Sequence, residues 1–250
     1  MTDVALIHAG IADSRMWAPQ LRSFAAEHRV IAPDLPGFGQ SPFDSDVVDY
    51  RASVRAALDA AGMERAAVVG TSFGGRIALE LTLESPERVS ALVLVGPGLD
   101  GHRWSEEMNA FDNEEEAALA RGDLDAAVDS QLRAWVAGPH RSLDAIHPGV
   151  RNLVAQMQRN AYELHQGHDD VRSTPLDPPA SQRLSEISMP TLVVTGDEDL
   201  ADIHEIADKL VAGIPGAERA TISDAAHLPN LERPEQFDRI VLGFLAEHGI

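Results

Sequence analysis

VVGTSFGGRIAL, residues 68–79, is the most informative stretch of this chain. A short apolar run leads into the pattern Gly-x-Ser-x-Gly at residues 70–74, and a segment compatible with a helix follows. In a strand-to-helix turn of this kind the serine lies on a sharp bend above the edge of a sheet. Gly70 and Gly74 then lack a Cβ where strand and helix pass close together. Ser72 would stand at a helix N-terminus, where free N–H groups and the helix dipole favour negative charge.

The pattern by itself allows two interpretations. Ser72 is either a catalytic nucleophile or a helix-capping serine in a glycine-rich turn. The flanking sequence favours the nucleophile, because residues 66–69 are typical of a buried strand and residues 77–83 are compatible with a helix.

Length and composition limit the class of protein. The chain has 250 residues, of which 44% are hydrophobic, and this suits one α/β domain with an insertion. A net charge of −20 argues against nucleic acid and anionic membranes as partners. The absence of cysteine excludes disulfides, thiolate metal sites and a cysteine nucleophile. No run predicts a membrane-spanning helix or a secretory signal, so a cytoplasmic location is expected.

Short apolar runs alternate with helical patterns, which predicts a mostly parallel sheet covered by helices on both faces. The expected strands are residues 4–7, 29–32, 66–69, 91–95, 191–195 and 218–222, and the expected helices are residues 16–27, 47–61, 75–84, 203–211 and 234–247. The interval between residues 95 and 191 is far longer than a crossover between parallel strands needs. It contains helix-like stretches at residues 106–120, 124–136 and 150–165. We therefore interpret residues 99–187 as a helical cap inserted over a core formed by residues 1–98 and 188–250.

A serine nucleophile requires a base, and the base requires an orienting acid. After a turn of the Gly-x-Ser-x-Gly type the expected order is acid and then histidine. Asp199 follows the expected strand 191–195, and His227 follows the expected strand 218–222. All three side chains would therefore lie at the carboxyl ends of parallel strands, where open α/β sheets place their active sites.

Both partners have alternatives. Asp197 lies in the same acidic loop as Asp199, and the carboxylates of such loops are most often solvated. A surface position is the alternative for His227, although the neighbouring Ala226 and Leu228 indicate partial burial.

The oxyanion hole should combine two backbone N–H groups. One belongs to Phe73, the residue after the serine, and the other to the loop that follows an early strand. Gly10 is the first candidate in that loop, because a glycine lets a substrate approach the backbone closely, and Ile11 is the second.

Taken together, these stretches resemble the α/β-hydrolase superfamily over the whole chain except the cap. The matching segments are His8-Ala9-Gly10 with Trp17, DLPGFGQS at 34–41, GTSFGG at 70–75, GDED at 196–199 and AHLPNLERP at 226–234. The resemblance implies an α/β-hydrolase fold without a cofactor, with a small molecule as substrate. It also implies that Ser72 is the nucleophile, that Asp199 orients the base His227, and that the amides of Gly10 and Phe73 bind the oxyanion.

Two departures from the family pattern bear on the prediction. Ala9 stands where the family usually has the glycine of a His-Gly pair. The family also usually carries an antiparallel hairpin before this strand, whereas here the strand begins almost at Met1. An N-terminal hairpin is thus expected to be missing, and residues 29–32 are expected to form an exposed sheet edge. Such an edge invites pairing, so a homodimer is an open prediction.

Several other patterns carry weaker predictions. GPGLDG at 96–101 matches a dinucleotide fingerprint, but neither the required helix nor a second strand follows it, so no cofactor is expected. HQGHDD at 165–170 resembles a metal-ligand cluster, but Gly167 interrupts the helical spacing and no metal is expected. Most cap aromatics should pack helices against each other, with Trp135 as the candidate for lining a substrate pocket; the set is Trp104, Phe111, Trp135 and Tyr162. Four cap arginines either hold a substrate carboxylate or form surface ion pairs: Arg133, Arg141, Arg151 and Arg159.

The sequence therefore predicts a serine hydrolase that cleaves a small carboxylic ester or lactone through an acyl-enzyme. Carbon–carbon bond hydrolases and perhydrolases of the same fold are alternatives, because the shape of the cap decides the substrate. A non-catalytic ligand receptor is a third, because a fold does not dictate activity. Neither the substrate nor the oligomeric state follows from the sequence.

Overall fold

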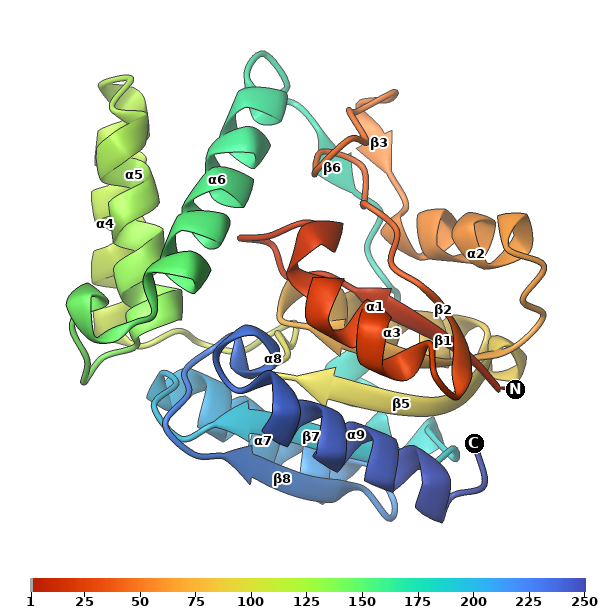
Figure 1. The fold of residues 1–250 in the computed structure, drawn as a ribbon. Helices are drawn as coiled ribbons and strands as arrows, with labels where there is room; N and C mark the ends of the chain where they lie inside the picture. Colours follow the sequence, from red (N-terminus) through yellow and green to blue (C-terminus); the bar gives the residue numbers. More distant parts are fainter. Residues whose placement is uncertain (1) are drawn as a thin grey trace.

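The main sheet of the protein has six strands, and all of its neighbouring strands run parallel. The fold is taken from a computed structural model, which describes residues 2–250. The strands, in their order across the sheet, are β2 (His28–Ile31), β1 (Thr2–Ile7), β4 (Ala66–Thr71), β5 (Val89–Val95), β7 (Thr191–Gly196) and β8 (Glu218–Ile222). The helices around it are α1 (Ala18–Phe24), α2 (Tyr50–Ala60), α3 (Phe73–Glu84), α7 (Ala201–Gly213), α8 (Pro229–Glu232) and α9 (Pro234–Glu247). The predicted α/β class is confirmed (Figure 1).

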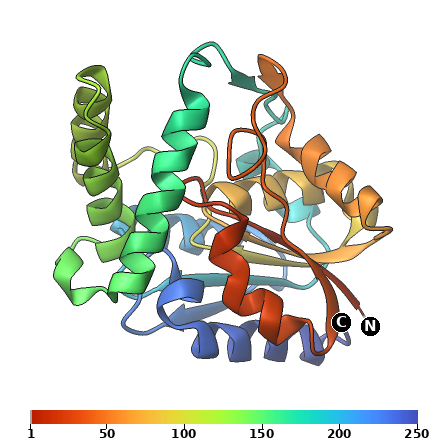
Figure 2. The same cartoon turned by 45° about the horizontal axis from the view of Figure 1, so that its top comes forward.

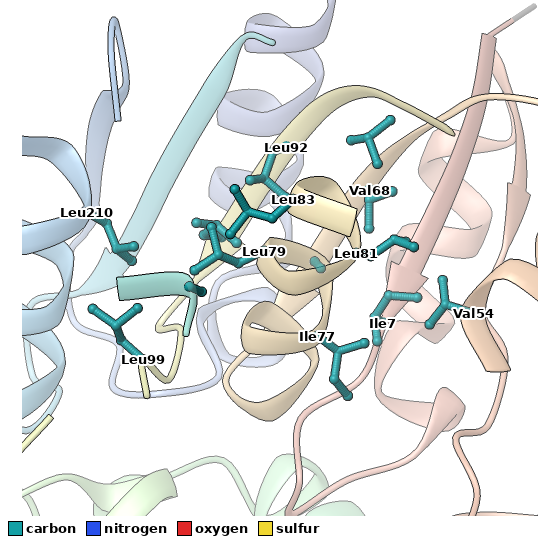
Figure 3. Close-up of a cluster of buried hydrophobic side chains, with 14 of the residues drawn as sticks. Ile7, Val54, Val68, Ile77, Leu79, Leu81, Leu83, Leu92, Leu99 and Leu210 are labelled. Atoms are coloured by element: carbon teal, nitrogen blue, oxygen red, sulfur yellow. The ribbon is translucent and has the colours of Figure 1, made fainter. Parts of the chain in front are cut away.

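Alternate residues of the strands point into two separate hydrophobic layers. Ala5 and Ile7 of β1 face one layer, and Val4 and Leu6 face the other, as the two-residue period of a strand requires. Helices α2, α3 and α7 cover the first face, and α1 and α9 cover the second. Figure 3 shows the first layer, where side chains of β1, β4 and β5 meet those of α2, α3 and α7. A sheet buried on both faces is thus held rigidly enough to position loops at its ends.

The strand order places a crevice at the carboxyl end of the sheet. After β1 the chain forms β2 on one side of β1, and it then crosses the sheet to form β4 on the other side of β1. Loops that leave adjacent strands in opposite directions open a crevice between them, which is the usual ligand site of such sheets. The loop after β1 carries Gly10, and the turn after β4 carries Ser72.

Three helices stand beyond this end of the sheet (Figures 1 and 2). They are α4 (Glu106–Ala120), α5 (Leu124–Gln131) and α6 (Pro148–His165), and we call them the cap helices. A π-helical segment, Leu132–Ala137, continues α5. The division into a core of residues 1–98 and 188–250 and a cap of residues 99–187 stays a prediction.

Three predicted helices differ from the observed ones by more than two residues at one end. The helix expected over residues 16–27 is a 3₁₀ turn, Ser14–Trp17, followed by α1. The helix expected over residues 47–61 begins only at Tyr50, because the side chain of Asp49 accepts hydrogen bonds from the amides of Arg51 and Ala52 and so caps it. Val47–Val48 instead form β3, which pairs in parallel with β6, Arg172–Ser173. The third, expected over residues 124–136, leaves α-helical geometry after Gln131.

The strand expected at the edge of the sheet does lie there, since β2 has β1 as its one neighbour within the described part of the chain. Whether a second copy of the chain covers this edge stays a prediction. None of the helices within residues 2–250 combines the length and apolarity that crossing a membrane would require.

Candidate active site

Ser72 occupies a strained turn between β4 and α3. Its backbone has φ 55° and ψ −115°, a conformation that costs a non-glycine residue roughly 1–3 kcal/mol. The Ser72 amide donates to the carbonyl of Val95 on the neighbouring strand at 2.8 Å, and the Ser72 carbonyl accepts from Arg76. Helix α3 starts at the next residue, so Ser72 lies at the end of the helix where the first-turn amides have no partner within the helix.

Both glycines of the turn are required by close backbone contacts. A Cβ on Gly70 would lie 2.3 Å from the carbonyl oxygen of Gly74. A Cβ on Gly74 would lie 2.4 Å from the carbonyl oxygen of His8, at the end of β1. The predicted role of these glycines in strand–helix packing is therefore confirmed.

Asp199 and His227 meet through their side chains, although 28 positions separate them in the sequence. Nδ1 of His227 lies 2.9 Å from Oδ2 and 3.2 Å from Oδ1 of Asp199, and both side chains are 1% exposed. Asp197, the alternative acid, is exposed. A carboxylate oxygen accepts, so in the neutral ring Nδ1 donates and Nε2 carries the lone pair. That Nε2 is buried without a hydrogen-bond partner among residues 2–250.

The loop after β5 connects this pair to the serine. Val95 accepts the hydrogen bond from Ser72, and the next residue, Gly96, has φ 47°. A Cβ on Gly96 would lie 3.1 Å from Nδ1 of His227 and 3.3 Å from Oδ2 of Asp199. Gly96 therefore lets the loop pack against the imidazole, and the first helix after the GPGLDG stretch, α4, starts only at Glu106.

Trp135 covers the imidazole from the cap side. Its ring centroid lies 4.3 Å from that of His227, and its carbonyl accepts from the His227 amide at 3.3 Å. The π-helical segment that carries it ends at Gly138, where φ is 75°. A Cβ on Gly138 would lie 2.1 Å from the carbonyl oxygen of Glu198 and 3.2 Å from Cβ of Ala226. The segment is thus fitted onto the two loops that carry Asp199 and His227.

Two cavities open on Ser72, and Trp135 lines both. The first, about 340 Å³, extends from the loop after β1 into the cap helices; its lining includes Gly10, Ile11, Glu115, Gln131, Gln158 and Tyr162. The second, about 310 Å³, is lined by Phe73, Arg76, Leu99, Asp100, His102 and Trp104 among others. Volumes of this size are typical of sites for small molecules. A small molecule lying across Ser72 would therefore have room on both sides.

The candidate oxyanion residues lie next to each other at the serine. A Cβ on Gly10 would lie 3.4 Å from Cβ of Phe73, so the loop after β1 packs on the start of α3. His8 fixes this loop, because its Nδ1 donates to the Ala9 carbonyl at 2.9 Å and its Nε2 accepts from the Leu35 amide at 3.0 Å. Burial lowers the pKa of His8, so the ring is neutral and can accept at Nε2.

The four cap arginines form ion pairs and do not line either cavity. Their partners are Glu114 and Asp129 for Arg133, Glu232 for Arg141, Asp144 for Arg151 and Asp125 for Arg159. Within residues 2–250, no three His, Cys, Asp or Glu side chains gather in a way that could hold a metal ion.

Sequence reasoning missed the polar lining of the first cavity. The Glu115 carboxylate accepts from the Tyr162 hydroxyl at 2.5 Å and from Nε2 of Gln131 at 2.7 Å. Burial raises the pKa of Glu115. Gln158 lies one helical turn before Tyr162 on α6 and is 6% exposed. The available signal was its position at helical spacing from the apolar Val154 and Ala161, on the face that α6 buries.

Comparison with known proteins identifies the family. The family model of the alpha/beta hydrolase fold matches residues 4–234. The 2-hydroxy-6-oxo-6-phenylhexa-2,4-dienoate hydrolase of Burkholderia cepacia is 30% identical, with 97% of this chain and 87% of that protein covered. Carboxylesterase YbfK of Bacillus subtilis is 26% identical over 96% of this chain and 79% of its own length.

A solved structure of an N-acyl homoserine lactone degrading enzyme superimposes with a TM-score of 0.75 at 27% identity, with 98% of this chain and 93% of that one covered. The relatives named here are hydrolases, and their likeness extends over nearly the whole chain. The chain therefore belongs to the α/β-hydrolase fold family of enzymes.

Proposed function

We propose that this protein is a serine hydrolase that cleaves a small carboxylic ester or lactone through an acyl-enzyme formed on Ser72. The observation that carries the proposal is the buried His227–Asp199 hydrogen bond at 2.9 Å, which leaves Nε2 of His227 without a partner in residues 2–250. Trp135, which packs on His227, lines both cavities that open on the strained turn of Ser72. Imidazole with its Nδ1 proton held by a carboxylate is the arrangement that a serine nucleophile requires.

The proposed reaction has two halves. Ser72 Oγ attacks the carbonyl carbon while its proton passes to Nε2 of His227, and the amides of Phe73 and Gly10 hold the oxyanion. The tetrahedral intermediate collapses, the C–O bond to the alcohol breaks, and the imidazolium returns the proton to the leaving oxygen. Water then gives a proton to His227, and its oxygen attacks the acyl carbon. The bond from that carbon to Ser72 Oγ breaks, the imidazolium returns the proton to Oγ, and the acid leaves. For a lactone, the alcohol and the acid belong to one product molecule.

The relatives support ester or lactone cleavage, since one is named a carboxylesterase and another a lactone degrading enzyme. The test is hydrolysis of p-nitrophenyl acetate and butyrate and of a panel of lactones by the purified protein. We expect turnover of at least one class. A folded protein that leaves both esters and every lactone intact would overturn the proposal for its simplest substrates.

Gly138 provides a test of how the cap positions the base. In Gly138→Ala, the new Cβ would meet the Glu198 carbonyl at 2.1 Å and displace the loops of Asp199 and His227. Because small displacements of reacting groups cost as much as ~100-fold in rate, we expect a large loss of kcat on p-nitrophenyl butyrate. Gly122→Ala is the matched control, since Gly122 also has a positive φ, 71°, but a Cβ there meets nothing within 4 Å. Equal activity of the two variants would contradict the expected role.

Carbon–carbon bond hydrolysis is the second candidate, and the 30% identity to the Burkholderia cepacia dienoate hydrolase favours it. The same serine turn and imidazole would be used, so variants of Ser72 do not separate the two functions. The two functions are separated by comparing the rate on a dienoate with the rate on the esters. Faster turnover of the dienoate would favour carbon–carbon bond hydrolysis over ester hydrolysis.

A further inference from the structure

Gln158 lines the first cavity, and its side chain carries a hydrogen-bond acceptor without a partner in the described part of the chain. Oε1 of Gln158 is buried and has no hydrogen-bond partner among residues 2–250, and the residue is 6% exposed. A buried carbonyl oxygen without a partner is less favourable than one that accepts a hydrogen bond. Gln158 therefore combines an unmet acceptor with a position on the wall of the cavity that Ser72 also lines.

The neighbours of Gln158 determine which ligand group suits it. The carboxylates of Glu115 and Asp112 line the same cavity, and no lysine or arginine of the described chain does. His165 is the one lining group that could become cationic, and desolvation lowers its pKa, so the ring is neutral at pH 7. An anionic ligand group would be repelled here, whereas a neutral donor would be satisfied.

Resting on the function proposed above, we propose that Gln158 is a specificity-determining residue that accepts a hydrogen bond from a hydroxyl or amide N–H on one arm of the substrate. The substrate class is thus an ester or lactone with a neutral, donor-bearing arm. Donor-free arms leave Oε1 of Gln158 unsatisfied, and carboxylate arms also meet Glu115.

The test compares p-nitrophenyl esters of ω-hydroxy acids with matched ω-methoxy and ω-carboxy esters of the same length. Because the ester can lie either way across Ser72, acetates of ω-hydroxy and ω-methoxy alcohols are measured as well. The wild-type protein should show kcat/KM for the hydroxyl member about tenfold or more above its partners, which is the ratio that one buried hydrogen bond supplies. Gln158→Met should abolish that ratio, so that kcat/KM for the hydroxyl member falls to the value of its partners.

Gln156→Met is the matched control, because Gln156 lies on the same helix but is exposed. It should keep the wild-type preference. A wild-type protein that does not prefer the hydroxyl-bearing ester in either orientation overturns the inference. A folded Gln158→Met variant that keeps this preference overturns it as well. If Gln158→Met does not fold, the wild-type ratios decide. A folded wild-type protein that turns over no ester and no lactone would instead overturn the proposed function, so the two failures are distinguishable.

Discussion

Replacement of Ser72 by alanine should reduce kcat for p-nitrophenyl butyrate by about 10⁴- to 10⁶-fold. The variant removes the oxygen that forms the acyl-enzyme, and no other group at the site would replace it. The fold should survive, because the turn is held by the contacts of Gly70 and Gly74 and by the Val95 carbonyl rather than by the hydroxyl. Initial rates together with the thermal unfolding temperature measure both effects.

Ser142→Ala is the control for this variant, because Ser142 is exposed and its side chain makes no capping hydrogen bond. It should retain wild-type kcat. Ser72→Ala with more than a tenth of the wild-type rate would remove Ser72 from the mechanism. If the wild-type protein turns over none of the esters but binds them, and Ser72→Ala binds them equally tightly, the receptor alternative fits instead.

Asp199→Asn should have the second largest effect, a fall in kcat of about 10⁴-fold. The asparagine amide can donate to Nδ1 of His227, which would move the ring proton to Nε2 and leave the serine without a base. Its carbonyl could still accept from the Leu200 amide, as Asp199 does at 2.9 Å, so the loop should keep its shape. Steady-state kinetics at constant pH would measure the loss.

Asp197→Asn is matched to this change, since Asp197 lies in the same loop and is exposed. We expect less than about a threefold change in kcat, because surface substitutions of this kind usually have small effects. A larger loss in Asp197→Asn than in Asp199→Asn would transfer the role of the acid to Asp197.

The four inner strands could be predicted closely from the sequence because a sheet buried on both faces leaves continuous apolar runs. The expected strand at residues 218–222 has the observed bounds, and the others differ at their ends by one or two residues. The small sheet of β3 and β6 could not be predicted, because two-residue strands far apart in sequence carry no periodicity. The 3₁₀ turn before α1 was missed since its residues fit a helical pattern equally well.

The candidate site divides in the same way. The loops of Ser72 and His227 could be predicted from short motifs. The glycines around Ser72 allow close backbone packing, and the apolar neighbours of His227 indicate that it is buried. The choice of Asp199 over Asp197 depends on which carboxylate the fold turns inward, and only the three-dimensional arrangement reveals that. Gln158 and Glu115 were missed because polar residues on a helix normally indicate a solvated face, whereas here that face closes a cavity.

An activated serine reacts with a fluorophosphonate, and this reaction does not require knowledge of the natural substrate. The protein should form one covalent adduct, located by peptide mass spectrometry at Ser72, and the Ser72→Ala variant should form none. A folded wild-type protein that stays unlabelled, or that is labelled equally in Ser72→Ala, would contradict the assignment of Ser72 as the nucleophile.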